Sequence, residues 1–416
     1  METDNKPALQ RGDKVRTAPW PTVGRRFGKE ELKQLREALE QNTLFYHHGQ
    51  KTRLMCAKMA KLCGAKFVTP CSSGSAALHG AVKAAGIGPG DEVITSPITD
   101  AGTILGIVYE GAIPVFADVD SASYNITADT ICRRLTARTR AVILVHLQGN
   151  PADIKPIVKL CRQKKLKLIE DCAQSWGAKV DDQWVGTFGD FGCFSLNDFK
   201  HIGCGDGGLI VSNNSKLYHT SWLAIDKCYD RLKGIRVLNF CAPNYRITEL
   251  QSAVAIAQLD KVKAIAARRN RLAKRLAVGL KKIHGLTPSK TVRGAFSTWW
   301  FYLIGYDEEA FNVDASAFCK AVNAEGIPMS VGYVEPVYLA YPYLRNGTAF
   351  NHSRWPFDRA KIKPRYGAGL CPVAERMAKE CLRFPLNEWL STKEIDDTLK
   401  ALAKTARHHS AKKFQK

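Results

Sequence analysis

The chain has 416 residues, 45% of them hydrophobic, so it is long enough to bury a sizeable core as one large domain and a smaller one. Its 61 Lys and Arg residues outnumber its 39 Asp and Glu residues, which gives a formal net charge of +22. No zinc finger, RNA-binding signature or basic stripe with interleaved aromatics accompanies that charge. This disfavours nucleic-acid binding and leaves either attraction of phosphorylated small molecules or a solvated, lysine-rich surface.

The start of the chain and its cysteines predict the compartment. The first residues, METDNKPALQRGDKVRT, are polar and of mixed charge, unlike a signal peptide, and no uncharged apolar run is long enough to cross a bilayer. Thirteen cysteines are scattered from Cys56 to Cys381 without a C-x-x-C pair. We therefore expect a cytoplasmic protein with no membrane partner, reduced and mostly buried cysteines, and no metal site.

In chain order, the first predicted element is a helix over residues 28–41. From residue 66 onward, short β-branched runs alternate with stretches of helical composition, such as residues 74–86 and 153–165. The predicted strands are 66–71, 91–97, 113–119, 141–147, 166–172, 191–196 and 208–212. This alternation predicts an α/β fold, with a mostly parallel seven-stranded sheet and helices on both faces, in a large domain over residues 1–258.

The rest of the chain predicts a smaller α+β domain. A long basic helix near residues 259–283 would link the two domains, and residues 297–305 have the composition of a strand. Residues 314–326 and 391–406 have helical patterns. We therefore expect a linker helix and small C-terminal domain over residues 259–406, followed by a basic tail over residues 407–416.

Ligands of such sheets bind beyond the carboxyl ends of the strands, so we examined where each predicted strand ends. The first ends before SSGSAALHGAV, in which Ser73, Gly74, Ser75 and Ala76 precede or begin a helix. Free backbone amides and the helix dipole make this segment a candidate phosphate site. The alternative is that a serine simply caps the helix.

A second strand ends in a pair of carboxylates, Glu170 and Asp171, with Gln174 three residues later. A carboxylate buried there needs a partner, which could be a metal, an arginine or a protonated ring nitrogen. The alternative is an aspartate that caps the next helix.

A third candidate is Lys200. It lies five residues after Ser195, which ends an apolar run, and shortly before a glycine-rich turn, GCGDGG. A lysine held between a buried strand and such a turn can have a depressed pKa and attack a carbonyl. Most single lysines, however, are solvated surface charges. A phosphate cradle, a carboxylate and a lysine, in this order, are the three groups needed to bind pyridoxal 5′-phosphate.

The same residues resemble the DegT/StrS family of sugar aminotransferases, the class VI group of fold-type I pyridoxal-phosphate enzymes. The resemblance covers most of the chain. It is carried in order by SSGSAALHGAV, GIGPGDEVITSP, GAIPVFADVD, VHLQGNPADIKPI, IEDCAQSWGA, FSLNDFKHIGCGDGG, NYRITELQSAVAIAQL and FPLNE.

The resemblance implies a role for each matching residue. Lys200 would form the Schiff base and shuttle the proton, Asp171 would pair with the pyridine nitrogen, and Gln174 would bond to the phenolic oxygen. The phosphate would be held by Ser75, Ala76 and Ser195, and by Asn244 of the neighbouring subunit. The resemblance therefore implies a homodimer with shared active sites.

The chain departs from the family pattern in two places, of which the change of GEGG to Gly205-Asp206-Gly207-Gly208 is mild. Family members usually have an aromatic residue that stacks on the cofactor ring where this chain has Asp100, in SPITDAGT. Retention of Lys200 favours transamination over the dehydratases in which histidine replaces the lysine. A dehydratase and a non-catalytic DegT-like regulator, to which the Asp100 departure gives room, are the alternatives.

We therefore expect an aminotransferase that moves an amino group from glutamate or glutamine to a nucleotide-linked keto sugar or a cyclitol by a ping-pong mechanism. Substrate contacts could come from the stretches Tyr46–Gly49 and Gly332–Pro336, which could equally be packing or loop residues.

Overall fold

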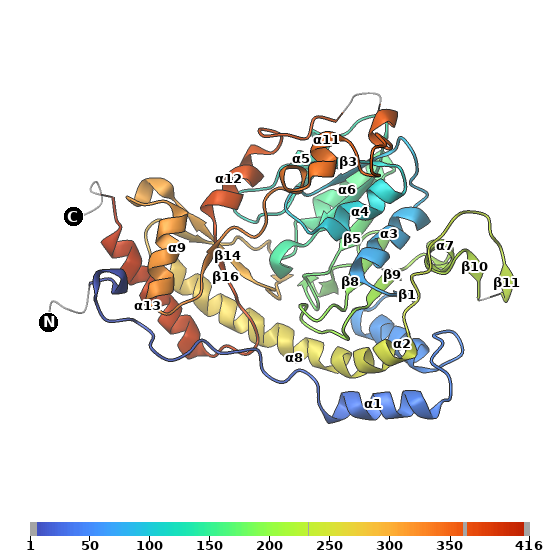
Figure 1. Cartoon of the computed structure of the whole chain (residues 1–416), viewed down its shortest axis with the longest axis horizontal. Coiled ribbons are helices and arrows are strands. Elements are labelled where there is room, and N and C mark those ends of the chain that lie inside the picture. Colours follow the sequence, from blue (N-terminus) through green and yellow to red (C-terminus); the bar gives the residue numbers. More distant parts are fainter. Residues whose placement is uncertain (1–5, 232, 361–363, 412–416) are drawn as a thin grey trace.

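The computed structural model describes residues 6–231, 233–360 and 364–411 (Figure 1). Its centre is a seven-stranded sheet in the order β1-β9-β8-β5-β4-β2-β3. The strands are β1 (Phe67–Cys71), β2 (Glu92–Thr95), β3 (Ile113–Phe116), β4 (Thr139–Val145), β5 (Lys167–Asp171), β8 (Phe191–Ser195) and β9 (Gly208–Ser212). Strands β8, β5, β4, β2 and β3 pair in parallel, and β9 is antiparallel to both of its neighbours. The predicted mostly parallel sheet is confirmed.

The strands in the middle of the sheet are buried on both faces, which explains why their sequences are apolar almost throughout. In β4, the residues from Ala141 to Leu144 are all fully buried. The surrounding helices are α1 (Lys29–Glu40), α2 (Lys51–Cys63), α3 (Gly74–Ala84), α4 (Ala101–Tyr109), α5 (Ala128–Cys132), α6 (Ile154–Lys164) and α7 (Ser215–Ile225). Helix α3 packs against β1, β8 and β9 and against α4 and α7.

Helix α8 (Glu249–Leu280) is the longest helix in the described chain and begins before the predicted start at residue 259. The sequence already carried its start signal. Thr248 accepts a hydrogen bond from the amide of Gln251, and the Gln251 side chain accepts one from the amide of Thr248, forming a capping box. Its first half packs into the core around the large sheet, and its second half packs into a separate hydrophobic cluster.

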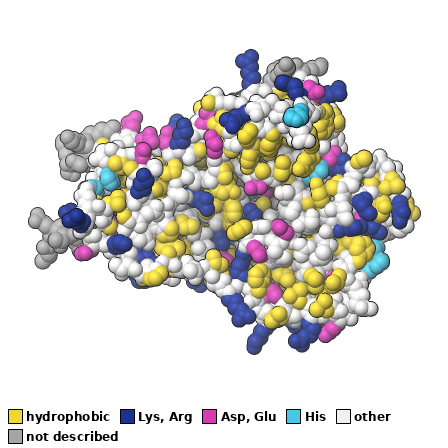
Figure 2. Space-filling model, viewed as in Figure 1, with side chains coloured by type: hydrophobic (Ala, Val, Ile, Leu, Met, Phe, Trp, Pro, Cys, Tyr) yellow, Lys and Arg dark blue, Asp and Glu magenta, His cyan; other side chains and the backbone are white. Residues whose placement is uncertain are grey.

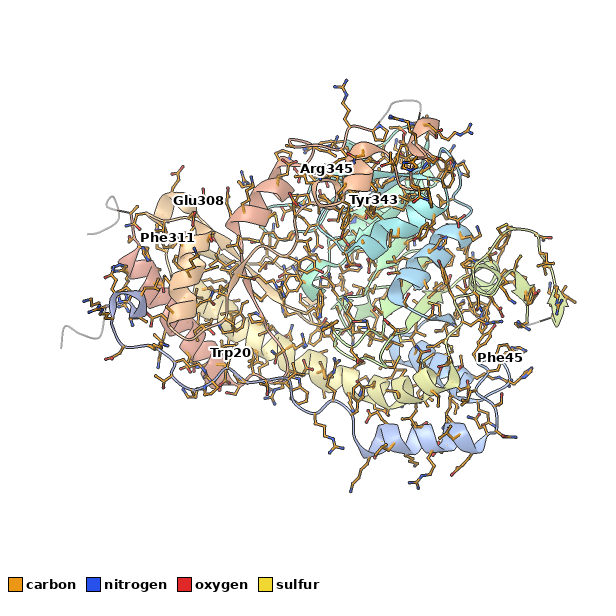
Figure 3. All side chains as sticks on the ribbon, in the orientation of Figure 1. Trp20, Phe45, Glu308, Phe311, Tyr343 and Arg345 are labelled. Carbon is orange, nitrogen blue, oxygen red and sulfur yellow. The ribbon has the colours of Figure 1, made fainter. Side chains whose placement is uncertain are left out.

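That second cluster lies on a four-stranded antiparallel sheet in the order β12-β14-β16-β15. Its strands are β12 (Leu286–Pro288), β14 (Tyr302–Tyr306), β15 (Ser330–Val331) and β16 (Leu382–Phe384), and helices α9 (Ala315–Ala324) and α13 (Thr392–His408) cover it. The N-terminal segment reaches the same cluster, since Trp20 packs edge-on against Phe384 (Figure 3).

The segment between β15 and β16 returns to the larger core. It contains α10 (Val337–Ala340), α11 (Pro342–Asn346) and α12 (Pro372–Glu380), and its buried residues join the cluster of the large sheet. The domain limits 1–258, 259–406 and 407–416 stay a prediction. Helix α8 crosses the first limit without a break, α13 continues to His408, and residues 412–416 lie outside the described residues.

Five short strands form a two-stranded sheet, β10-β11, and a three-stranded sheet, β13-β6-β7, and none of them was predicted. They are β6 (Lys179–Val180), β7 (Gln183–Trp184), β10 (Tyr229–Asp230), β11 (Ile235–Arg236) and β13 (Ala295–Phe296). Two residues are too few to show the alternation by which a strand is recognised in a sequence.

The distribution of surface charges and the environment of the cysteines agree with what the composition predicts. Lys and Arg side chains are spread around the visible face and mixed with acidic ones (Figure 2). All thirteen cysteines are free, and most are buried, as expected. Among the described residues, no helix has both the length and the apolar character that a bilayer span requires.

Candidate active site

A cavity of about 490 Å³ opens at the carboxyl ends of β1, β2, β5 and β8. Its walls come from the loops that follow these strands, and Asp206, Trp300 and Tyr333 complete them. The three sequence features that suggested a cofactor, at the start of α3, at Asp171 and at Lys200, therefore meet in one cavity.

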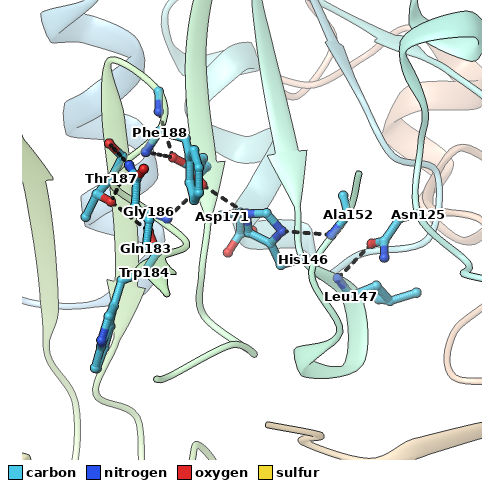
Figure 4. A network of polar contacts seen from close by, with 12 residues as sticks. Asn125, His146, Leu147, Ala152, Asp171, Gln183, Trp184, Gly186, Thr187 and Phe188 are labelled. Atoms are coloured by element: carbon cyan, nitrogen blue, oxygen red, sulfur yellow. Dashed lines mark hydrogen bonds and ion pairs between the residues drawn. The ribbon is translucent and has the colours of Figure 1, made fainter. Parts of the chain in front are cut away.

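The two carboxylates at the end of β5 have different environments, because successive side chains of a strand point to opposite faces. Glu170 is fully buried and faces away from the cavity. Its two oxygens accept hydrogen bonds from the amides of Gly186, Phe188 and Gly189 at 2.7–2.8 Å and from His146 Nε2 at 3.1 Å (Figure 4). Four donors fill the lone-pair sites of a carboxylate, so Glu170 has a structural role.

His146 is held in one tautomer by this network. Its Nδ1 accepts a hydrogen bond from the amide of Ala152 at 3.1 Å, so the proton lies on Nε2 and is donated to Glu170 (Figure 4). His146, Glu170 and Cys172 are close enough together to resemble a metal-ligand set. Because Glu170 and both nitrogens of His146 are already bonded within the chain, the group acts as a buried hydrogen-bond network.

Asp171 faces the cavity and keeps unused acceptor capacity. Its Oδ2 accepts a hydrogen bond from Thr103 Oγ1 at 2.8 Å, and its Oδ1 accepts one from the amide of Ala173 at 3.1 Å. Burial raises the pKa of Asp171, although these hydrogen bonds and the charge of Lys200 oppose the rise. A buried carboxylate with one bond on each oxygen is ready to accept another donor.

Lys200 lies on the loop that joins β8 to β9, with its side chain against the wall of the cavity. Its Nζ is 3.9 Å from the centroid of the Trp300 ring. The guanidinium of Arg26 donates to the carbonyls of Asp198 and Lys200 and so holds the loop. Burial lowers the pKa of Lys200, while Asp171 and Asp100 partly oppose the change. Lys200 is therefore not a solvated surface charge, and a larger share of it is the neutral, nucleophilic amine.

The start of α3 agrees with both interpretations of its serines, the helix cap and the phosphate site. Ser73 is the N-cap, since its Oγ accepts a hydrogen bond from the amide of Ala76 at 3.0 Å. The amides of Gly74 and Ser75, the first two residues of the helix, have no partner within the helix and face the cavity. Gly74 allows a close approach, because a Cβ there would lie 2.7 Å from the Cβ of Ser195.

Asp100 lines the cavity and caps α4. Its Oδ1 accepts a hydrogen bond from the amide of Gly102 at 2.9 Å. Two helix N-termini, those of α3 and α4, thus meet at this wall, where a Cβ on Gly102 would lie 2.5 Å from Ser75 Oγ. Both helix dipoles favour a negative charge there.

The side chain of Gln174 is held in the cavity by the backbone of the loop that follows β4. Its Oε1 accepts a hydrogen bond from the amide of Gln148 at 2.7 Å, and its Nε2 contacts the hydroxyl of Tyr333 at 3.4 Å. Gln148 itself has φ +55°, and a Cβ on Gly149 would lie within 2.7 Å of the Trp299 amide and the Gln174 carbonyl. The tight turn therefore sets the position of Gln174.

The structure brings most of the predicted site residues together. Those that line the cavity are Gly74, Ser75, Asp100, Asp171, Gln174, Ser195 and Lys200. Ala76 is buried behind this wall, with its amide bonded to Ser73. Asn244 is exposed outside the cavity, beside Asp226, on the segment before α8. The stretch Tyr46–Gly49 does not line the cavity either, and Tyr46 is buried with its hydroxyl 2.5 Å from Asp226.

Several cavity residues were not named individually from the sequence, among them Thr103, Trp300 and Tyr333. Thr103 follows Asp100 at helical spacing and carries the hydroxyl bonded to Asp171. Tyr333 lies in the stretch Gly332–Pro336, which was a substrate-contact candidate, and Trp300 was taken only as part of a strand. Trp300 had no signal of its own, because two adjacent tryptophans before a strand do not reveal which one faces a ligand.

Comparison with known proteins identifies this arrangement. The model of the DegT/DnrJ/EryC1/StrS aminotransferase family matches residues 25–403. The chain belongs to this family. The predicted family, the fold class and the class of enzyme, a transaminase, are thereby confirmed.

Individual members of the family are similar over nearly the full length. A putative L-glutamine:3-amino-2,3-dideoxy-scyllo-inosose aminotransferase of Micromonospora echinospora is 32% identical and covers 96% of both chains. A UDP-N-acetyl-3-dehydro-alpha-D-glucosamine 3-aminotransferase of Acidithiobacillus ferrooxidans is 32% identical over 83% of this chain and 86% of its own. The crystal structure of an aminotransferase from Psychrobacter cryohalolentis superposes with a TM-score of 0.80 at 27% identity, covering 92% of this chain and 97% of its own.

Proposed function

We propose that this protein is a pyridoxal-phosphate aminotransferase that moves an amino group from glutamine or glutamate to the keto group of a cyclitol or a nucleotide-linked sugar. The observation that carries the proposal is the meeting of Lys200, Asp171 and the first turn of α3 in one cavity of a family member. Each of the three supplies a group that the cofactor requires.

The side chains of the cavity fit the chemical parts of pyridoxal phosphate. The amides of Gly74 and Ser75 and the hydroxyl of Ser195 would bind its phosphate at the positive end of α3. Asp171 would accept a hydrogen bond from the protonated ring nitrogen, which gives this buried carboxylate the partner that it lacks within the chain. Gln174 would donate its amide to the phenolic oxygen, replacing its long contact with Tyr333.

When bound, pyridoxal phosphate supplies the carbonyl that receives the amino group and the ring that accepts electrons from the bond that breaks. Lys200 would bond covalently to the carbonyl carbon of the cofactor. As a free amine, it would then take a proton from the α-carbon of the substrate and deliver it to the cofactor carbon next to the ring. Its lowered pKa favours the neutral amine that this step needs. Asp171 would keep the ring nitrogen charged throughout.

Two relatives support the class of acceptor. One is named for a glutamine donor and an inosose acceptor, and the other for a UDP-linked keto sugar. Lys200, which donates and accepts the proton in both directions, suits a ping-pong cycle in which the donor product leaves before the acceptor binds. A dehydratase on the same fold would release water and leave no nitrogen in the sugar product.

The assembly and the compartment complete the proposal. We infer a homodimer in which Asn244 reaches the phosphate of the neighbouring subunit, and its exposed position outside its own cavity supports this role. Thirteen free cysteines suit a reducing compartment such as the cytoplasm.

The test is a visible absorbance spectrum of the purified protein with added pyridoxal phosphate. We expect the band of the lysine-bonded cofactor, its loss on addition of glutamine or glutamate, and its absence in Lys200→Ala. Lys155→Ala, at an exposed lysine paired with Asp181, is the matched control and should behave as the wild type. A band that survives in Lys200→Ala refutes the role of Lys200. Loss of water without nitrogen transfer to the sugar assigns the dehydratase instead.

A further inference from the structure

An arginine with no acidic partner lies beside the cavity. Arg383 is the middle residue of β16, between Leu382 and Phe384, which are both fully buried in the second cluster. Because side chains alternate along a strand, Arg383 points to the opposite face of that sheet. In Figure 1, β14 and β16 lie between α9 and α13 on one side and the large sheet on the other, so this face is directed toward the large sheet.

Two aromatic rings hold the guanidinium of Arg383. Its Cζ is 5.3 Å from the ring centroid of Phe301 and 5.7 Å from that of Tyr333. These two rings stack on each other with centroids 4.6 Å apart, and Trp300 meets Tyr333 edge-on. Tyr333 and Trp300 line the cavity, and the Nζ of Lys200 lies over Trp300. One continuous aromatic wall therefore runs from the guanidinium to the lysine.

Within the described residues, the side chain of Arg383 has no hydrogen bond and no ion pair, while its backbone pairs with β14 and β15. Two other guanidiniums, bonded to this wall and to the Lys200 loop, are already occupied. Arg26 donates to two backbone carbonyls of the Lys200 loop, and Arg269 is paired with Glu388 and bonded to the carbonyl of Trp300. A half-buried guanidinium, fixed by cation–π contacts but without an acceptor, is prepared for an anionic ligand at little further cost in side-chain entropy.

Away from the two helix N-termini, the side chains of the cavity give an anionic ligand little positive charge. Its walls carry three carboxylates, Asp100, Asp171 and Asp206, against the single cation of Lys200. Both proposed amino donors carry an α-carboxylate, whereas a cyclitol acceptor carries no anion. The donor thus needs a cation that the cavity walls lack, and a guanidinium binds a carboxylate through two parallel hydrogen bonds.

We propose that Arg383 binds the α-carboxylate of the amino donor at the edge of the cavity, and so selects amino acids as donors. This assignment rests on the proposed function, which names those donors. Arg383 would be a binding residue that meets the donor on the side of the smaller sheet, opposite the loops that would hold the cofactor.

The first test uses glutaramate, which is glutamine without its α-amino group and so cannot react. Its dissociation constant is measured by calorimetry on the holoenzyme and on Arg383→Gln, which removes the charge but keeps most of the length. We expect binding to weaken about 10- to 100-fold, the range for a lost charge-assisted hydrogen bond. Arg376→Gln, at an exposed arginine paired with Glu380 on α12, is the control and should bind as the wild type.

A second measurement identifies which group of the donor is bound. The wild type should prefer glutamine over 4-aminobutanamide, its analogue without the α-carboxylate, and Arg383→Gln should lose most of that preference. Arg383→Lys, which keeps the charge without the two-pronged geometry, should lie between the two. If Arg383→Gln does not fold, the same comparison in Arg383→Lys decides the question.

Three results would overturn the assignment: unchanged glutaramate binding in Arg383→Gln, weakened binding of UDP instead of glutaramate, or no glutaramate binding by the wild type. Weakened UDP binding would assign Arg383 to the diphosphate of a nucleotide sugar. Failure of the proposed acceptor looks different, because the wild type would then take nitrogen from glutamine, with Arg383-dependent affinity, and pass it to no keto sugar.

Discussion

At the scale of single residues, Asp100 explains how a departure from the family pattern is compatible with this fold. Its carboxylate accepts the hydrogen bond from the amide of Gly102 and so satisfies a donor at the start of α4 that an aromatic side chain cannot satisfy. Aromatic surface comes instead from Trp300 and Tyr333 on the other side of the cavity. Asp100 is thus a helix cap at the mouth of the site.

Replacement of this cap gives a measurable change in stability. Asp100→Ala should lower the free energy of unfolding by about 1 kcal/mol, because α4 loses its N-cap, and Asp100→Asn should keep most of it. Since Asp100 is exposed, little packing is lost with its side chain. The measurement is urea denaturation of the three proteins without cofactor. Equal stability of Asp100→Ala and the wild type would show that the cap contributes nothing.

The sequence could predict Lys200 and Asp171 because their motifs are local, but it could not predict Trp300. Trp299 has φ +48°, a left-handed conformation that is rare for a bulky residue. Trp299 packs into the second cluster, and Trp300, on the other side of this turn, reaches the cavity. The direction of each ring depends on a backbone angle enforced by the loop around Gly149, from a distant part of the chain.

At the scale of elements, the wall beside the cofactor site depends on the contact between α3 and α4. Glu110, at the end of α4, accepts hydrogen bonds from His79 and Lys83 of α3 at 2.7 and 2.8 Å. The other ring nitrogen of His79 bonds to the hydroxyl of Tyr245, the neighbour of Asn244. This network therefore joins the two helices whose N-termini face the cavity to the segment proposed to serve the neighbouring subunit.

The same network predicts a pH dependence of stability. Burial alone would raise the pKa of Glu110, but the hydrogen bonds from His79 and Lys83 outweigh it and hold the pKa below its ordinary value of 4.5. The contribution of the carboxylate is therefore fully present above about pH 4.5 and is lost as the pH falls through the folded-state value.

Glu110→Gln should thus lower the free energy of unfolding by about 1–3 kcal/mol at pH 7, and the difference from the wild type should shrink as Glu110 becomes protonated. Urea denaturation at several pH values between 7.5 and 3 measures this difference. Glu40→Gln, at an exposed position on α1, is the control and should change little at any pH. A difference that does not depend on pH would mean that packing, and not charge, is responsible.

At the scale of the whole molecule, helix α8 and strand β14 each contribute to two hydrophobic clusters. The first half of α8 belongs to the cluster around the large sheet, and the second half belongs to the smaller one. The proposed cofactor site lies on the large sheet, while Trp300 and Tyr333 reach it from segments next to β14 and β15. The geometry of the cavity thus depends on how rigidly α8 and β14 connect the two clusters.

The seven strands of the large sheet could be predicted because each contains a short, mostly apolar run rich in residues that favour strands. The path of the chain after β15 could not, because α10, α11 and α12 are short and their apolar residues resemble those of the smaller cluster. They nevertheless pack on the larger core, where Tyr338 is fully buried. The spacing of apolar residues indicates that one face of an element is buried, but it does not indicate against which hydrophobic core.

The shared active site of the proposed homodimer can be tested with mixed subunits. Lys200→Ala and Asn244→Ala should each be nearly inactive alone. In a hybrid of the two, one site keeps Lys200 of one subunit and Asn244 of the other, so a random mixture should recover about one quarter of the wild-type activity. Mixing Lys200→Ala with Asp171→Asn should recover none, because both residues belong to the same cavity. No recovery with Asn244→Ala would refute the shared site.

The contact between the two ends of the chain has a consequence for how the protein is made. Arg16, on the N-terminal segment, forms ion pairs with Glu394 and Asp397 of α13, 381 residues away from Asp397 in sequence. A ribosome that adds about 5–20 residues per second needs about 20–80 s to make that intervening chain. The segment around Arg16 therefore leaves the ribosome long before its partner exists, and the nascent chain carries it undocked while the next 381 residues are translated.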